Sequence, residues 1–154
     1  MRVLRTVLLL LFGGLLAVAA GCASLKTPVF STDDGAIRGY DPVAYHTEHR
    51  PVKGDAAYRY HYNDATWYFA SEENLALFRS DPERYTPQYG GYCAYAMSKG
   101  YVVSTDPEAW YVERDKLYLN FSKSVRETWL EDIPGYVAKA DGHWQQKLAQ
   151  PGFE

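Results

Sequence analysis

Aromatic and polar residues alternate along two neighbouring segments of the chain. Residues 56–62 read AAYRYHY and residues 65–71 read ATWYFAS, with Asn63 and Asp64 between them. Alternation with a period of two is typical of strands, and the short polar pair favours a tight turn. We therefore expect an antiparallel hairpin. Phe69 rather than Tyr68 should face the following helix, because it has no hydroxyl group that needs a partner when buried.

The second half of the chain contains further strand-like segments. They read YVVS, AWYVE and KLYLNF, at residues 101–104, 109–113 and 116–121. Arg114 and Asp115 are predicted to form the turn of the last hairpin.

Helices are predicted where a capping residue precedes a periodic apolar stripe. Ser71 is followed by Leu75 and Phe78, which lie three positions apart on one helical face. A capping aspartate followed by proline predicts short helical turns at Asp41-Pro42 and Asp81-Pro82.

A helix is also expected over residues 89–100, ending at Gly100. Its apolar face would comprise Tyr89, Tyr92, Cys93, Ala96 and Met97.

Residues 122–148 are predicted to form two helices, because Pro134 breaks a continuous helix and suits the start of a new one. The packing stripe of the second helix would comprise Tyr136, Val137, Ala140 and Trp144. The predicted fold class is α+β: a small antiparallel sheet of aromatic strands covered by helices, with a C-terminal helical extension.

The N-terminus has the layout of a secretory signal peptide at residues 1–21, with basic, apolar and small residues in succession. An uncleaved anchor helix is the alternative. The ending AAGC resembles a bacterial lipobox, which implies lipidation of Cys22. By that resemblance, Ala23 favours the periplasmic face of the outer membrane, although Ala19 departs from the usual branched residue. Residues 22–36 are predicted to be a tether and residues 37–150 a single domain.

Charge and motifs exclude several function classes. The chain has a net charge of −3, which becomes −5 without the leader, and it has no basic run. We therefore expect no nucleic-acid binding. The sequence also lacks the nucleophile motif of serine hydrolases, a phosphate loop and a dinucleotide fingerprint. The missing catalytic motifs and the lipobox resemblance together favour a non-enzymatic protein that contacts the membrane through its lipid anchor.

The segments YDPVAY, YRYHYNDATWYFASEENLALFRSDPERY and QYGGYCAYA resemble the YHS domain, from about Tyr40 to Tyr85. The resemblance implies a fold related to treble-clef metal-binding domains, here of an exported bacterial type. Metal-handling members of that family carry cysteines at positions that this sequence fills with Ala44, Ala70 and Asn74. The resemblance therefore implies the fold without the usual metal site, and no cofactor is predicted.

The candidate site centres on Cys93, the only cysteine outside the leader and its lipobox. Near a helix start its thiol would favour the thiolate, whereas a core position would make it inert. The ligand-binding candidates are Gly90, Gly91, Tyr92 and Cys93, since the glycines would let a ligand approach the backbone.

The expected function is therefore a lipid-anchored periplasmic binding or accessory protein of unknown ligand. The alternative is a thiol-dependent or metal-handling protein that uses Cys93. Copper or zinc would then be bound by Cys93 together with His46 or His61.

Overall fold

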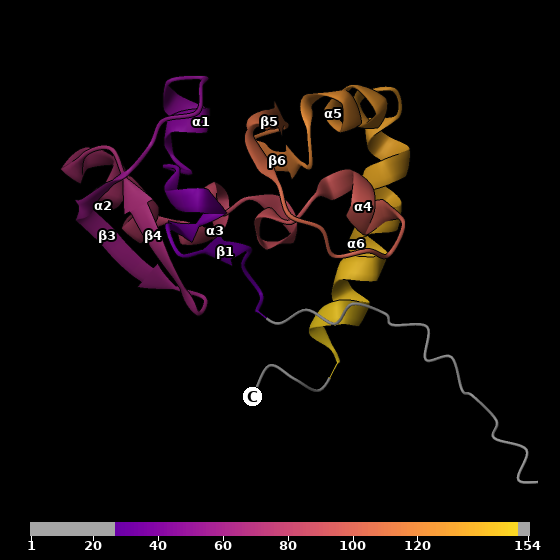
Figure 1. Cartoon of the computed structure of the whole chain (residues 1–154), viewed down its shortest axis with the longest axis horizontal. Coiled ribbons are helices and arrows are strands. Elements are labelled where there is room, and N and C mark those ends of the chain that lie inside the picture. The colour runs from indigo at the N-terminus through magenta and orange to yellow at the C-terminus, as the bar shows by residue number, and fades with distance from the viewer. Residues whose placement is uncertain (1–26, 151–154) are drawn as a thin grey trace, which may run out of the picture.

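The computed structural model describes residues 27–150 of the chain, which form an α+β fold (Figure 1). The strands pair as separate antiparallel two-stranded sheets, β1 with β2, β3 with β4 and β5 with β6, rather than as one sheet. The elements in chain order are β1 (Ser31–Thr32), β2 (Gly35–Ala36), η1 (Ile37–Gly39), α1 (Ala44–Thr47), β3 (Asp55–Tyr62), β4 (Ala65–Phe69), α2 (Glu72–Ser80), α3 (Pro82–Tyr85), η2 (Gln88–Gly91), α4 (Ala94–Ser98), β5 (Asp106–Glu113), β6 (Lys116–Asn120), α5 (Lys123–Leu130) and α6 (Ile133–Leu148).

The predicted first hairpin is confirmed. Strands β3 and β4 pair around Asn63 and Asp64, whose φ angles of 54° and 58° give the turn its left-handed geometry. Phe69 is fully buried and lies 5.1 Å from the ring of Phe78 on α2, whereas Tyr68 is half-buried. The choice of Phe69 as the helix-facing residue is therefore correct.

The helix caps predicted from the sequence are also present. The side chain of Ser71 accepts a hydrogen bond from the backbone N–H of Asn74, and Asp81 caps α3 in the same way. Gly100 closes α4, since its N–H bonds to Met97 and that of Tyr101 to Ala96. In the C-terminal part, α5 and α6 are separate helices with Pro134 in the first turn of the second.

Two segments differ from the sequence-based expectation. The helix expected over residues 89–100 begins only at Ala94, because Tyr89 and Gly90 have φ angles of 58° and 61° that interrupt it. Residues 101–104 form no strand. Instead the carbonyl of Val103 accepts the N–H of Cys93 at 3.0 Å, so this segment folds back over the start of α4.

One hydrophobic core joins the two halves of the described chain. Val29 and Ile37 from its beginning lie in the same buried cluster as Leu117 and Leu119 of β6. Of the residues expected to form a tether, 22–36, the structure buries Val29, Phe30 and Ala36 and leaves Ser31, Asp33 and Asp34 exposed. The expected signal peptide, Cys22 and residues 22–26 lie outside the described residues.

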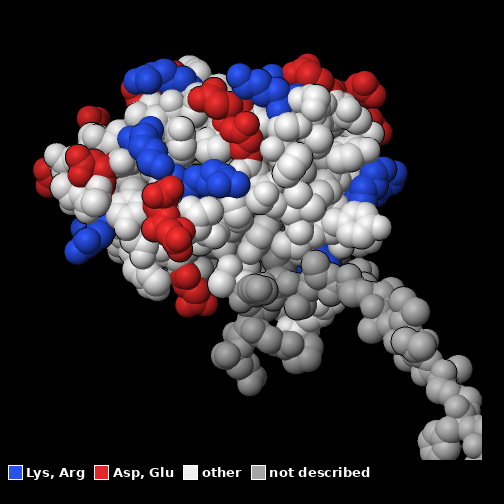
Figure 2. Space-filling view, viewed as in Figure 1, with Lys and Arg blue, Asp and Glu red and all other residues white. Residues whose placement is uncertain are grey.

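A second buried cluster lies between α4, α5, α6 and β6, around Met97 and Trp129. Helix α6 packs against the short helix α4, and Ala140 belongs to this buried cluster (Figure 1). Within residues 27–150, no helix has the length and apolarity needed to cross a bilayer. Acidic and basic side chains are interspersed on the face shown in Figure 2, which carries no large patch of one sign.

Candidate functional site

Cys93 lies at the N-cap of α4 and is almost fully buried, with 1% of its surface exposed. Its Sγ accepts hydrogen bonds from the backbone N–H groups of Phe121 at 3.3 Å and Ala96 at 3.5 Å. Burial raises the pKa of the Cys93 thiol, and these backbone donors only partly oppose it. At neutral pH the group is therefore a protonated thiol, and it donates to the side-chain oxygen of Asn120 at 3.7 Å.

Asn120 is the polar partner that the sequence analysis missed. Its side chain is fully buried at the end of β6, and its Oδ1 also accepts the N–H of Tyr95 at 3.1 Å. Its Nδ2 has no hydrogen-bond partner among the described residues. The only signal in the sequence was an asparagine in the otherwise apolar segment LYLNF.

The two glycines of the candidate site pack against the protein itself. Gly90 approaches the backbone carbonyl of Pro28 so closely that an added Cβ would collide with it. A Cβ on Gly91 would lie 2.5 Å from the side chain of Ile37. The Gly90 carbonyl also accepts the N–H of Phe30 at 2.9 Å. The glycines therefore serve the docking of the N-terminal segment, where we had expected them to admit a ligand.

Tyr92 anchors the same N-terminal segment. Its hydroxyl donates to the carbonyl of Thr27 at 3.1 Å, and its ring lies 5.8 Å from that of Phe30. The four ligand-binding candidates are thus brought together by the fold, but they are buried and face protein atoms.

The histidines proposed as alternative metal ligands lie elsewhere. The His46 side chain is 5% exposed, with its Nδ1 3.5 Å from Asp115 and its ring edge-on to Tyr85 at 5.4 Å. His61 is exposed on β3. Neither appears among the polar contacts of Cys93, and residues 27–150 contain no group of three or more His, Cys, Asp or Glu suited to a metal.

Asp41 lies between Ala44, Ala70 and Asn74, the positions at which the sequence analysis found no cysteine. It is completely buried, and its Oδ1 accepts the backbone N–H groups of Val43 at 2.8 Å and Ala44 at 3.3 Å. Its Oδ2 accepts the N–H of Ala70 at 2.8 Å and the side-chain amide of Asn74 at 2.7 Å. One carboxylate therefore joins Ala44, Ala70 and Asn74, the three positions at which the resemblance described above implies cysteines in metal-handling relatives.

Comparison with known proteins finds a family match for part of the chain. The family model of the YHS domain matches residues 43–89, a segment that includes Ala44, Ala70 and Asn74 and stops short of Cys93. No curated protein and no solved structure matched the chain. Residues 43–89 of this chain are a YHS domain.

Proposed function

We propose that this chain is an exported, lipid-anchored binding or accessory protein at the periplasmic face of the outer membrane. Its YHS domain, which we take to retain the treble-clef-related fold, would act as a scaffold without a structural metal. The observation that carries this proposal is the buried Asp41 carboxylate, which binds four hydrogen-bond donors from three segments.

The chemistry of Asp41 explains why such a scaffold does not need metal. A structural zinc site joins separate chain segments through thiolate or imidazole ligands. Here the carboxylate joins the start of α1, the end of β4 and α2 through charge-assisted hydrogen bonds. The hydrophobic core, which includes Trp67, Phe69 and Phe78, supplies the remaining stabilisation.

The proposed anchor would hold the domain close to the membrane. Val29 is already part of the core, and only seven peptide units separate it from Cys22. Even a fully extended chain of that length reaches about 25 Å. A binding surface on this domain would therefore act within a short distance of the bilayer.

Mass spectrometry of the mature protein tests the anchor. The expected mass begins at a Cys22 that carries acyl chains, and Cys22→Ser should release the protein from the membrane fraction. A mature protein that begins at Cys22 without lipid, or that retains Met1, would contradict the anchor. Metal analysis tests the scaffold: we expect a zinc content far below one per chain and an unchanged unfolding temperature after chelation.

A thiol-dependent role for Cys93 is the second candidate. It is favoured by the two backbone N–H groups that point at Sγ. These donors would stabilise negative charge on sulfur. Burial opposes ionisation more strongly, which is why we place this role second.

A further inference from the structure

The outer edge of β5 forms the floor of an open hollow of about 510 Å³. We call it the β5 trough, and its lining residues are His49, Trp110, Tyr111, Val112, Arg126 and Leu130. Strand β5 pairs only with β6 among the described strands, so its other edge carries no partner strand there. The trough is therefore a strand edge with side walls, rather than a purely apolar pocket.

The register of the hairpin decides which backbone groups face the trough. Glu113 pairs with Lys116 across the Arg114-Asp115 turn, whose φ angles of 51° and 61° define a two-residue hairpin. The pair that flanks such a turn exchanges both hydrogen bonds, and the pattern then alternates. Trp110 and Val112 therefore direct their N–H and C=O groups away from β6.

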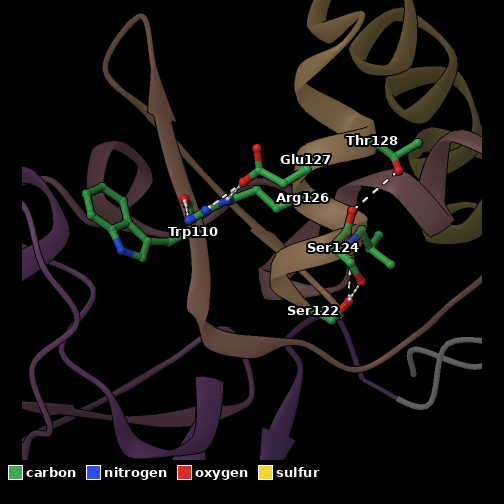
Figure 3. A network of polar contacts seen from close by, with 7 residues as sticks. Trp110, Ser122, Ser124, Arg126, Glu127 and Thr128 are labelled. Carbon is green, nitrogen blue, oxygen red and sulfur yellow. Dashed lines mark hydrogen bonds and ion pairs between the residues drawn. The ribbon is translucent and has the colours of Figure 1, made fainter.

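Arg126 confirms this orientation independently. Its side chain reaches from α5 to β5, where NH1 donates to the carbonyl oxygen of Trp110 at 3.4 Å (Figure 3). That carbonyl must point away from β6 to be reached from α5. The N–H of Trp110 and both backbone groups of Val112 then remain as hydrogen-bonding groups on the trough floor.

One wall of the trough holds a cationic side chain. Arg126 is the one lysine or arginine among the lining residues, and no lining residue is a carboxylate. The guanidinium is mostly buried and is held by Glu127, whose own side chain is exposed to solvent and lies outside the lining (Figure 3). An incoming carboxylate can therefore reach the guanidinium and compete with Glu127 for it.

We propose that the β5 trough binds an extended, carboxylate-bearing peptide segment of a partner protein by strand addition next to β5. Strand addition is the binding mode in which main-chain hydrogen bonds give affinity and flanking pockets give specificity. The outward groups of Trp110 and Val112 would pair with the peptide backbone, and Arg126 would bind its carboxylate. This inference rests on the proposed binding role and gives that role a surface and a class of partner.

The β3 edge provides an internal control. By the same register rule, Arg59 and His61 direct their backbone groups away from β4. Their side chains are exposed to solvent. A peptide that binds any free strand edge would therefore affect both β3 and β5, whereas the proposal requires β5 alone.

Amide hydrogen exchange of the mature, detergent-solubilised chain tests the proposal by NMR. The probe is a short synthetic peptide of alternating threonine and valine with a C-terminal glutamate. We expect it to slow exchange at Trp110 and Val112 and to leave Arg59 and His61 unchanged. A peptide with N-methylated backbone amides should lose this effect, and a C-terminal lysine amide should weaken it.

Variants of the protein sharpen the test. Val112→Pro removes one floor donor at an edge position where proline is tolerated, and His61→Pro is its counterpart on β3. Arg126→Gln should weaken binding of the glutamate peptide by about tenfold, the equivalent of one charge-assisted hydrogen bond, whereas Arg59→Gln should not.

Several results would overturn the proposal. Protection of Arg59 and His61 would move the site to β3, and equal binding of the N-methylated peptide would exclude strand addition. Protection of Trp110 that rises with protein concentration alone would point to self-association. No protection up to the solubility limit of the peptide would end the proposal. Failure of the lipid anchor would appear only in the mass measurement, so the two failures are distinguishable.

Discussion

The carboxylate of Asp41 and the side-chain amide of Asn74 lie 2.7 Å apart and join the start of α1 to α2 across 33 residues of sequence. Asp41 is completely buried, and Asn74 is half-buried. The YHS resemblance implies that metal-handling relatives carry a cysteine at the position of Asn74. In this chain a hydrogen-bonded carboxylate joins the segments there, and the stability of the domain should depend on it.

Asp41→Asn should lower the free energy of unfolding by about 2–4 kcal/mol. An amide can accept hydrogen bonds only at its oxygen. Its NH₂ group would therefore face the donors that now bind one of the two carboxylate oxygens. Each buried donor left without an acceptor costs about 1–3 kcal/mol. Urea unfolding of the variant and the native protein measures the difference. Asn74→Ala, which removes one of the four donors, should cost less. Equal stability of Asp41→Asn and the native protein would show that the carboxylate does not link these segments.

Phe78→Ala should cost about 3–5 kcal/mol, the usual range for full truncation of a buried aromatic residue. Its ring lies 5.1 Å from Phe69 and 5.4 Å from Trp67, and the side chain is fully buried. Phe121→Ala is the matched control, because that ring is 53% exposed and its loss should cost under about 1 kcal/mol. Similar losses for the two variants would contradict the placement of Phe78 in the core.

Cys93 should react slowly with thiol reagents at neutral pH in the native protein. Burial raises the pKa of the Cys93 thiol, so little of it is ionised at neutral pH. Because the thiolate is the reactive form, labelling should become faster as pH rises. The measurement compares labelling rates of native and urea-unfolded protein in a Cys22→Ser background. Native labelling as fast as unfolded labelling would identify an exposed or activated thiolate and favour the thiol-dependent role.

Stability should fall as pH drops below about 6.5, in part because of His46. Burial lowers the pKa of His46 in the folded state from its ordinary value of 6.5, with Asp115 opposing this shift and Arg84 and His49 adding to it. The unfolded chain therefore binds more protons between the two pKa values. The stabilisation is complete above the unfolded pKa and is lost as pH falls through the folded one.

Urea unfolding of the native protein and of His46→Gln at about pH 5 and about pH 7.5 measures this contribution. We expect the variant to lose less stability on acidification than the native protein does. An identical pH dependence in the two proteins would mean that His46 titrates equally in the folded and unfolded states.

Gly90→Ala and Gly142→Ala should shift stability in opposite directions. At Gly90 the φ angle is 61° and an added Cβ would collide with the Pro28 carbonyl, so we expect a loss of more than about 2 kcal/mol. Gly142 lies inside α6 with nothing within 4 Å of an added Cβ, so alanine should stabilise by about 0.5–1 kcal/mol. Thermal unfolding of the two variants checks both signs.

The local elements could be predicted because their signals lie within a few residues of one another. The hairpin turn at Asn63 and Asp64 and the caps at Ser71 and Asp81 depend on side chains and backbone groups no more than three positions apart. The helix over 89–100 was predicted too long because its apolar spacing is that of a helix. The close packing of Gly90 on Pro28, which interrupts it, comes from a segment 62 positions away.

The sequence by itself determined the α+β class, the two hairpins with their turns, the helix caps at Ser71 and Asp81, and the YHS resemblance. Only the tertiary structure decided what Asp41 binds, where Cys93 points and which strand edge stays open. Each of these features joins groups that are distant in sequence, as Asp41 does with Ala70 and Cys93 with Asn120. The periodicity of one segment shows which of its faces is buried, but it does not show which distant segment packs there. Hydrogen bonds and packing depend on closeness in space, which the spacing of residues along the chain does not give.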